Sequence, residues 1–428
     1  MSSKPIITSF LDTDAYKFHM HQAVFHSYND VVASFEFNCR NKDDYLGIYA
    51  DEIREQVEMM RDVVLTEEEY HYLNELPHFK KDYTEYLKTY RYKPEQVRVE
   101  QIPPVLEPES PHFGEDGSKL VISVEGPWVE TILWEIPLLA IVSEVAQRRR
   151  HPHIGPAQAV EKLNTKLDAF FDAHTDDELK SFKVSDFGTR RRFSKDVQEA
   201  IVTTLLHHPK FKSHLVGTSN YDLARRLNIP AVGTQAHEWF QAFQQLSAEL
   251  RSSQTDALKA WLREYPYSLG IALTDCITMD AFLADFNSEL ANAYQGLRQD
   301  SGDPVRWGQK ALAHYKRLGI DAKEKVLVFS DGLNLETAAE LYNKFKDQVN
   351  VMCGIGTQLT CSIEGVRAMN IVLKMVRCQG KPVAKISDST GKIMCEDTEF
   401  IEKLCETFQV ASPVSRATTI QKLPSVAP

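Results

Sequence analysis

The sequence predicts an α/β protein built around a parallel sheet, from the alternation of its segments and from its length. From residue 157 onward, short apolar runs alternate with stretches long enough to form a helix. Seven such runs predict parallel strands, because a parallel pair needs a helical crossover between its strands. Their number favours a (β/α) barrel, and an open, doubly wound sheet is the alternative, since alternation cannot show closure. The 428 residues are enough for two domains, or for one barrel with an appended domain.

The first third of the chain lacks this alternation. Residues 11–17 are expected to open a helix with Asp12 or Thr13 as its N-cap. Residues 32–37 and 121–127 have the patterns of strands. Between them, the prolines and glycines of residues 103–118 indicate a loop or a hairpin connection.

The alternating region begins with an amphipathic helix over residues 157–173. The seven strand candidates that follow are residues 182–187, 214–218, 231–234, 270–275, 294–298, 325–331 and 349–354. A hairpin over residues 371–386 is expected to return to the N-terminal part, and the composition after about residue 408 is that of a linker. The expected domains are an α/β domain from residues 1–125 and 370–408, a catalytic barrel from 126–369, and a flexible tail from 409–428.

The composition is that of a soluble globular protein, and it argues against several classes of function. The chain is 43% hydrophobic and 25% charged, and its net charge of −11 disfavours nonspecific binding to nucleic acid or to an anionic membrane. The seven cysteines show no CxxC pair and no zinc-like spacing, which indicates reduced thiols. No signal-peptide core follows Met1, and the strongest apolar run, residues 136–142, is too short to span a bilayer. These features predict a cytoplasmic location and leave room for a nuclear pool.

Polar residues suited to binding or catalysis follow several predicted strands, where a side chain is rigidly held yet open to a ligand. Residues 186–192, Asp-Phe-Gly-Thr-Arg-Arg-Arg, place three arginines after the first strand. The planar fork of arginine binds phosphate bidentately, although a solvated basic helix start would have the same pattern. Residues 217–220, Gly-Thr-Ser-Asn, offer hydroxyl and backbone donors, or simply a helix cap.

A histidine occupies a comparable position. His237 comes directly after the apolar run 229–232 and its turn, at the start of a predicted helix. An imidazole there suits catalysis, while a helix-capping histidine is the plainer interpretation. No second histidine or cysteine lies at ligand spacing, so a zinc-type triad is not indicated. A nucleophilic serine is not indicated either, because the chain has no GxSxG elbow.

The later strand ends carry carboxylates and small residues. Residues 298–304, Arg-Gln-Asp-Ser-Gly-Asp-Pro, set one arginine and two carboxylates around a glycine. Such carboxylates can hold Mg²⁺ through water or contact ribose hydroxyls, although Asp303 is also well placed to cap the next helix. The turns at Asp331-Gly332 and at residues 354–357 can cradle phosphate with backbone N–H groups. The chain has neither a GxxxxGK(S/T) motif nor a GxGxxG motif.

Taken together, these motifs resemble the nicotinate phosphoribosyltransferase family, in order, from about residue 6 to residue 395. The matching segments are Asp12-Thr-Asp-x-Tyr16-Lys17, Asp186-Phe-Gly-Thr-Arg-Arg, Gly217-Thr-Ser-Asn, Gly233-Thr-x-Ala-His237-Glu238-Trp239, Leu273-Thr-Asp275 and Arg298-Gln-Asp-Ser-Gly-Asp303-Pro. The resemblance implies an irregular (β/α) barrel plus an α/β domain built from both chain ends. It also implies formation of nicotinate mononucleotide and pyrophosphate from nicotinate and 5-phosphoribosyl 1-pyrophosphate, coupled to ATP hydrolysis. This reaction opens NAD salvage from nicotinate.

The resemblance also implies roles for individual residues. Tyr16 and Phe187 would stack on the pyridine ring, and Arg298, with Ser219 nearby, would receive the nicotinate carboxylate. His237 would be phosphorylated by ATP and oriented by Asp275. Mg²⁺ would arrive with the substrate near Asp275 and Asp300, without a dedicated protein site. The residues expected around the phosphoribosyl group and the phosphates are Arg190, Asp303, Asp331, Gly332, Gly354, Gly356, Thr357, Arg40, Lys385 and Lys392, the last three supplied by a partner subunit in some relatives.

Two other functions remain as alternatives at this point. A transferase of the same fold can use nicotinamide or quinolinate, but the nicotinamide-using relative carries an aspartate where this chain has Ser219, so Ser219 favours nicotinate. A noncatalytic ligand-sensing protein is the second alternative, and it would be expected to lack several site residues. The partners expected are small molecules (nicotinate, phosphoribosyl pyrophosphate and ATP), with no nucleic acid and no membrane, and a homodimer is allowed.

Overall fold

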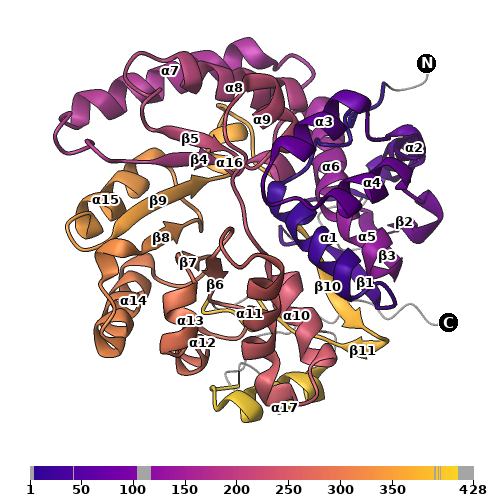
Figure 1. The fold of residues 1–428 in the computed structure, drawn as a ribbon. Coiled ribbons are helices and arrows are strands. Elements are labelled where there is room, and N and C mark those ends of the chain that lie inside the picture. The colour runs from indigo at the N-terminus through magenta and orange to yellow at the C-terminus, as the bar shows by residue number, and fades with distance from the viewer. Residues whose placement is uncertain are drawn as a thin grey trace, which may run out of the picture.

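Two β-sheets of different kinds organise the structure, a computed structural model that describes residues 4–41, 43–103, 117–389, 392–393, 395 and 397–412 (Figure 1). One sheet has six strands in the order β5-β4-β9-β8-β7-β6, and the other has five in the order β11-β10-β1-β3-β2. All pairs in the first sheet are parallel, and all pairs in the second are antiparallel. The predicted α/β class, with a parallel sheet formed by the second part of the chain, is confirmed.

The parallel sheet contains six of the seven predicted strands. They are β4 (Val184–Asp186), β5 (Leu215–Thr218), β6 (Ile271–Leu273), β7 (Gly296–Gln299), β8 (Val326–Phe329) and β9 (Asn350–Ile355). The prediction of a strand over residues 231–234 is wrong, because only Ala231 forms a bridge there, with Thr218. Pro230 has no N–H to donate to a ladder, and Gly233 has a φ of +154°, so the backbone leaves the strand conformation.

The ladder of hydrogen bonds stays open among the described residues, with β5 and β6 as its edges. The irregular segment 230–234 lies between these edges. The Thr218 N–H donates to the Pro230 carbonyl at 3.2 Å, and the Val232 N–H donates to the Thr218 carbonyl at 2.9 Å. At the other edge, the Thr234 hydroxyl donates to the Ile271 carbonyl of β6 at 2.9 Å. A few hydrogen bonds therefore connect segment 230–234 to both edge strands, β5 and β6. The chain continues from this segment directly to His237.

The antiparallel sheet combines strands from both ends of the chain. Its members are β1 (Val32–Cys39), β2 (Val97–Ile102), β3 (Lys119–Pro127), β10 (Ile371–Cys378) and β11 (Lys381–Pro382). The central strand β1 pairs with β3 on one side and with β10 on the other. The predicted N-terminal strands and the returning hairpin are thus confirmed. One hydrophobic core includes residues of both sheets, so the domain boundaries stay a prediction.

Helices cover both sheets (Figure 1). In the N-terminal part they are α1 (Ala15–Ser27), α2 (Ala50–Met59), α3 (Glu67–Glu75), α4 (Lys81–Thr89), α5 (Trp128–Thr131) and α6 (Glu135–Arg150). The helices before, between and after the parallel strands are α7 (Pro156–Ala173), α8 (Lys195–His207), α9 (Tyr221–Leu227), α10 (His237–Leu246), α11 (Ser253–Glu264), α12 (Met279–Asp285), α13 (Ser288–Ala293), α14 (Pro304–Leu318), α15 (Leu335–Phe345) and α16 (Thr357–Thr360), and α17 (Thr398–Phe408) follows the hairpin. The predicted helix over 157–173 corresponds to α7. Within the described part of the chain, no helix is both long and apolar enough to cross a membrane.

Two predicted segments fall partly outside the described residues. The antiparallel pairing of β2 with β3 confirms that a hairpin connection joins them, but residues 104–116 of that loop lie outside the described part. The same holds for residues 413–428 of the predicted tail.

The predicted N-cap of α1 is wrong, and the reason is a buried ion pair. The helix begins at Ala15 after Asp14, and Asp12 is bound instead by Arg192. The two terminal nitrogens of Arg192 donate to the two carboxylate oxygens of Asp12 at 2.7 and 2.9 Å, and Asn220 donates to one of these oxygens at 2.8 Å. Burial would raise the pKa of Asp12, but the Arg192 charge and hydrogen bonds outweigh it and lower that pKa. The pair ties the N-terminus to the loop after β4.

Replacing Asp12 tests how much this ion pair contributes to the free energy of unfolding. Asp12→Ala removes the bidentate partner of the buried Arg192 guanidinium and leaves it Glu144, 3.7 Å from its Nε; breaking a buried pair in this way typically costs about 3–5 kcal/mol of unfolding free energy. We expect a clearly lower urea midpoint than in the wild type. Asp43→Ala is the control, because it breaks the exposed pair with Arg367 and should leave the midpoint unchanged. Equal midpoints for the two variants would contradict the assignment.

Candidate active site

The predicted site residues gather at the carboxyl edge of the parallel sheet. His237 is the first residue of α10, and its Nε2 lies 2.9 Å from Oδ1 of Asp275, which follows β6. The other oxygen of Asp275 accepts from the Ser301 hydroxyl at 2.5 Å and lies 3.1 Å from Nζ of Lys385. Asp300, directly after β7, lies 3.7 Å from His237 Nε2. The structure therefore brings His237, Asp275, Asp300 and Lys385 together, as the resemblance implies.

His237 is neutral in this setting. Burial and the Lys385 charge lower the pKa of His237 to about 4, although Asp275 and Asp300 oppose the shift. The neutral ring carries one proton, and the hydrogen bond to Asp275 assigns that proton to Nε2. Nδ1 therefore holds the lone pair, and it has no hydrogen-bond partner among the described residues. A histidine in this state is a nucleophile at neutral pH.

Arg298 belongs to β7, and two contacts of its guanidinium hold it beside this cluster. One terminal nitrogen donates to the Gln235 carbonyl at 3.2 Å, and the other lies 3.6 Å from Oδ1 of Asp300. Its buried Nε has no partner among the described residues. Arg298 thus keeps hydrogen-bonding capacity beyond the contacts that orient it.

The two aromatic residues expected to stack on a planar ring lie at the same edge. The Phe187 N–H donates to the Ile355 carbonyl of β9 at 2.9 Å. A Cβ at position 354 would lie only 2.3 Å from the Phe187 ring, so this position needs glycine. Tyr16, in the first turn of α1, is 7% exposed, and its hydroxyl lies 3.5 Å from Glu135.

Ser219 makes hydrogen bonds through its side chain and through its backbone N–H and carbonyl groups. Its hydroxyl donates to Asp14 at 2.6 Å, its N–H donates to the Asp186 carbonyl at 2.7 Å, and its carbonyl accepts from the Ala15 N–H at 2.6 Å. The last contact fixes α1, and with it Tyr16, against the turn after β5. The structure thus brings Ser219 next to the start of α1, with its hydroxyl engaged by Asp14.

The three consecutive arginines after β4 have different partners. Arg191 donates to the Ile371 carbonyl at 2.9 Å, and Arg192 forms the buried pair with Asp12. Arg190 lies 3.7 Å from Asp14 and 3.8 Å from Glu135, and its side chain remains 34% exposed. Arg191 is also partly exposed, and the charges of Asp300 and Asp331 act on it, so exposure excludes only Arg192, and the role expected for Arg190 stays a prediction.

The predicted phosphate turns lie at the ends of β8 and β9. Asp331 pairs with Nζ of Lys392 at 2.7 and 2.8 Å, and Gly332 has a φ of +66°. Gly356 and Thr357 form the turn into α16. Asp303 is exposed and caps α14, accepting from the Arg306 N–H at 2.6 Å, so the capping interpretation is confirmed and its phosphate role stays a prediction.

The three cations that the resemblance implies near the phosphates, Arg40, Lys385 and Lys392, lie beside carboxylates of this edge. Lys385 contacts Asp275, Lys392 contacts Asp331, and Arg40 at the end of β1 interacts electrostatically with Asp300 and Asp331. Segments from both ends of the chain thus bring positive charge to this edge.

Sequence reasoning missed a buried network next to His237. Nζ of Lys17 lies 2.7 Å from Glu135 and also contacts Glu238, whose other oxygen accepts from Trp128 Nε1 at 2.6 Å. Glu238 was visible inside a quoted motif, whereas Glu135 stands at the head of the apolar run of α6. A glutamate beside a long apolar run was the only signal available for it.

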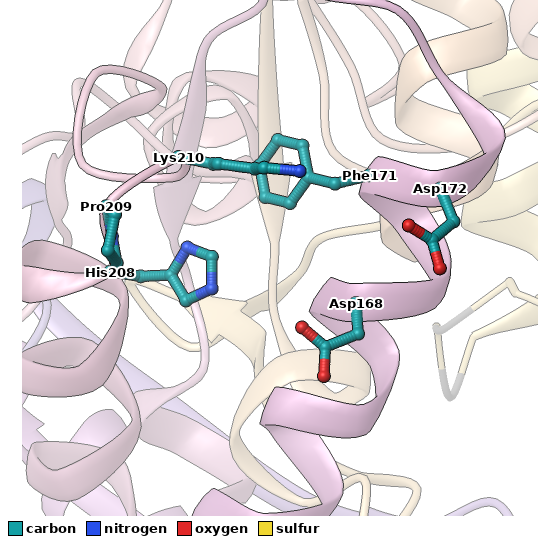
Figure 2. Close-up of a pocket in the computed structure, with 6 residues that line it drawn as sticks. All are labelled: Asp168, Phe171, Asp172, His208, Pro209 and Lys210. Atoms are coloured by element: carbon teal, nitrogen blue, oxygen red, sulfur yellow. The ribbon is translucent and has the colours of Figure 1, made fainter.

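A separate pocket lies away from this edge, between α7 and the connection from α8 to β5 (Figure 2). Its volume is about 210 Å³, and it is lined by Asp168, Phe171, Asp172, His208, Pro209 and Lys210. The His208 ring stacks on Phe171 at 5.7 Å between ring centres, and Lys210 Nζ lies 5.4 Å from the Phe171 ring centre. No predicted site residue lines it, so it is not part of the candidate site.

Comparisons with known proteins agree along nearly the whole chain. Residues 182–412 match the model of the nicotinate phosphoribosyltransferase (NAPRTase) family, and residues 11–143 match the model of the NAPRTase N-terminal domain. The nicotinate phosphoribosyltransferase of Pectobacterium carotovorum is 54% identical over 410 residues, covering 96% of this chain and 98% of that protein. The enzyme of the same name from Erwinia tasmaniensis is 55% identical over 406 residues, covering 95% and 97%.

Solved structures give the same result. The nicotinate phosphoribosyltransferase of Vibrio cholerae superposes with a TM-score of 0.88 at 39% identity, covering 97% of this chain and 96% of that one. The one from Porphyromonas gingivalis has a TM-score of 0.84 at 31% identity, covering 95% of this chain and 100% of that one.

Proposed function

The chain belongs to the nicotinate phosphoribosyltransferase family, whose reaction joins nicotinate to 5-phosphoribosyl 1-pyrophosphate, and we propose that it couples this reaction to ATP hydrolysis through a phosphohistidine at His237. The products are nicotinate mononucleotide and pyrophosphate. The observation that carries the proposal is the contact of His237 Nε2 with Asp275, which leaves Nδ1 as the nucleophilic nitrogen.

The phosphorylation step follows from this tautomer. The Nδ1 lone pair attacks the γ-phosphorus of ATP, the bond to the bridging oxygen breaks, and ADP leaves with that electron pair. Asp275 keeps the ring oriented and stabilises the positive charge that develops on it, while Lys385 interacts with the incoming phosphate. The phosphohistidine is a high-energy anionic group beside the substrate site. It can strengthen substrate binding, and its hydrolysis moves the overall reaction forward.

The transfer step needs alignment more than a base. The bond from ribose C1 to pyrophosphate breaks as the pyridine nitrogen bonds to C1, so charge develops on both C1 and the leaving group. Arg190 and Lys385 would balance the charge on the pyrophosphate. Tyr16 and Phe187 would hold the pyridine ring, and Arg298 would hold its carboxylate. These assignments agree with the position of each side chain at the carboxyl edge.

The acidic residues fit Mg²⁺ that arrives with the substrate. One ligand atom from each of His237, Asp275 and Asp300 lies within 4.8 Å of the others. The Asp275 oxygens are already taken by His237, Ser301 and Lys385, whereas Asp300 is 28% exposed and its cationic neighbours lie at 3.6–3.8 Å. Asp300 would therefore contact the ion, which supplies charge neutralisation for the diphosphate. Lys385 opposes a permanent metal site at Asp275.

The turn at Ser219 supports nicotinate as the base. A carboxylate at this position would lie beside Asp14, and two acids together would repel the nicotinate carboxylate. Serine instead hydrogen-bonds Asp14 and adds no charge. A transferase for nicotinamide or quinolinate is the alternative that the assay must separate.

We expect single-turnover assays to give product from nicotinate and little from nicotinamide or quinolinate. Ser219→Asp should lower kcat/KM for nicotinate relative to nicotinamide by at least about tenfold, because like charges in a site cost several kcal/mol. Ser219→Ala, which adds no charge, is the matched control and should keep the preference. Comparable efficiency of the wild type with nicotinamide would contradict the proposal.

Labelling with γ-labelled ATP tests the role of His237. The wild type should acquire label that is labile to acid and stable to base, and His237→Asn should acquire none while keeping some transferase activity that ATP no longer stimulates. His314→Gln is the control, because this buried histidine contacts the Phe286 carbonyl away from the site. Label that persists in His237→Asn would refute the assignment.

A further inference from the structure

A buried glutamate that has no role in the reaction so far faces two residues of the candidate site. Glu135 is the first residue of α6 and is 6% exposed. Its Oε2 lies 2.7 Å from Nζ of Lys17 and 3.5 Å from the Tyr16 hydroxyl, whereas its Oε1 lies 3.8 Å from a terminal nitrogen of Arg190. The two oxygens of Glu135 therefore have different neighbours, and one of them faces Arg190.

Arg190 lies between two carboxylates without being bound by either. Oδ2 of Asp14 is 3.7 Å from Arg190 Nε, on the other side from the contact with Glu135 through the terminal nitrogen. Both distances exceed the length of a hydrogen bond, and the Arg190 guanidinium makes no hydrogen bond to any residue that the structure describes. Its donors are thus left for a ligand, while two acids oppose its charge.

Glu135 is ionised at this position. Burial would raise the pKa of Glu135, but the charges around it, that of Lys17 first, outweigh burial and lower this pKa to about 2. Lys17 also contacts Glu238, so its single charge is shared between two carboxylates. Glu135 therefore keeps negative charge beside Arg190 at neutral pH.

We propose that Glu135 is a positioning residue that acts through Arg190 and limits the attraction of this arginine for pyrophosphate, so that the product can leave the site. The inference rests on the proposed function, in which Arg190 balances the charge of the leaving pyrophosphate. A cation that stabilises the leaving group also retains the product, and product release limits the rate of many enzymes. An acid behind the cation weakens its hold on a multiply charged anion, because the acid and the anion repel each other.

Glu135→Gln tests the proposal, because it removes the charge and keeps the size of the side chain. Calorimetry should show Mg²⁺-pyrophosphate binding tightened by at least about fivefold, since one unit of repulsion close to the anion is lost. Product inhibition by pyrophosphate should strengthen, and the KM for the phosphoribosyl donor should fall. The KM for nicotinate should stay unchanged, because the amide oxygen can still accept from Tyr16. A glutamate with a purely structural role would not tighten binding when it is replaced.

Two further variants at the same arginine make the test independent of one substitution. Asp14→Asn removes the other acid beside Arg190 and should also tighten Mg²⁺-pyrophosphate binding. Glu135→Asp keeps the charge and should keep the wild-type affinity.

Two buried glutamates provide matched controls. Glu238→Gln removes the other carboxylate from Lys17, and Glu238 forms no ion pair with Arg190 within the described ranges. Glu144→Gln changes a glutamate of the same helix, 3.7 Å from Nε of Arg192, which is bound to Asp12 instead of a ligand. Both controls should leave the affinity for pyrophosphate unchanged.

The outcomes separate this inference from the proposed function. Unchanged or weaker pyrophosphate binding in folded Glu135→Gln or folded Asp14→Asn would overturn the inference alone. Equal tightening in Glu238→Gln would also overturn it, because the effect would then come from the released charge of Lys17. Failure of the wild type to bind pyrophosphate would overturn the inference and the proposed function together.

Discussion

The hydrogen bond between His237 and Asp275 is the constraint on which the rest of the site depends. It places the single proton of the neutral imidazole on Nε2 and leaves the lone pair on Nδ1, the nitrogen for which we propose phosphorylation. The bond is maintained because Asp275 is itself held ionised: Lys385 and Ser301 bind its other oxygen, and burial without them would favour the protonated acid. Three distant segments meet at this one carboxylate, namely the start of α10, the loop after β7 and the C-terminal hairpin. The fold brings these three segments together at the carboxylate of Asp275.

Two features of the fold allow these segments to reach the same carboxylate. The segment 230–234 replaces a strand between β5 and β6, and it delivers His237 to the carboxyl edge of the sheet at the point where Asp275 emerges. The antiparallel sheet, assembled from both chain ends, leads from β11 into Lys385, so this cation at Asp275 comes from a different layer than His237. The parallel sheet and its loops thus supply His237, its carboxylates and the arginines of the site, and the segment after the antiparallel sheet adds Lys385.

Much of this could be predicted from the sequence, and the failures have physical causes. Six parallel strands could be predicted because buried strands are continuous apolar runs. The turns of the site could be predicted because polar residues follow those runs. The strand over 231–234 failed because Pro230 lacks a donor, and the Asp12 cap failed because Arg192, far along the chain, competes for the carboxylate. Local patterns also could not rank the three arginines after β4. Glu135 escaped attention because it stands beside an apolar run, where only a tertiary contact reveals its charged neighbour Lys17.

The central claim is that phosphate is transferred to Nδ1 of His237, and the bond to Asp275 makes this claim specific to one nitrogen. Phosphorus NMR of the protein phosphorylated by ATP, with proton correlation across the imidazole ring, distinguishes the two phosphohistidine isomers. The account predicts the Nδ1 isomer, with Nε2 still protonated and hydrogen-bonded to Asp275. Phosphate on Nε2, or on a carboxylate or hydroxyl instead of histidine, would contradict it.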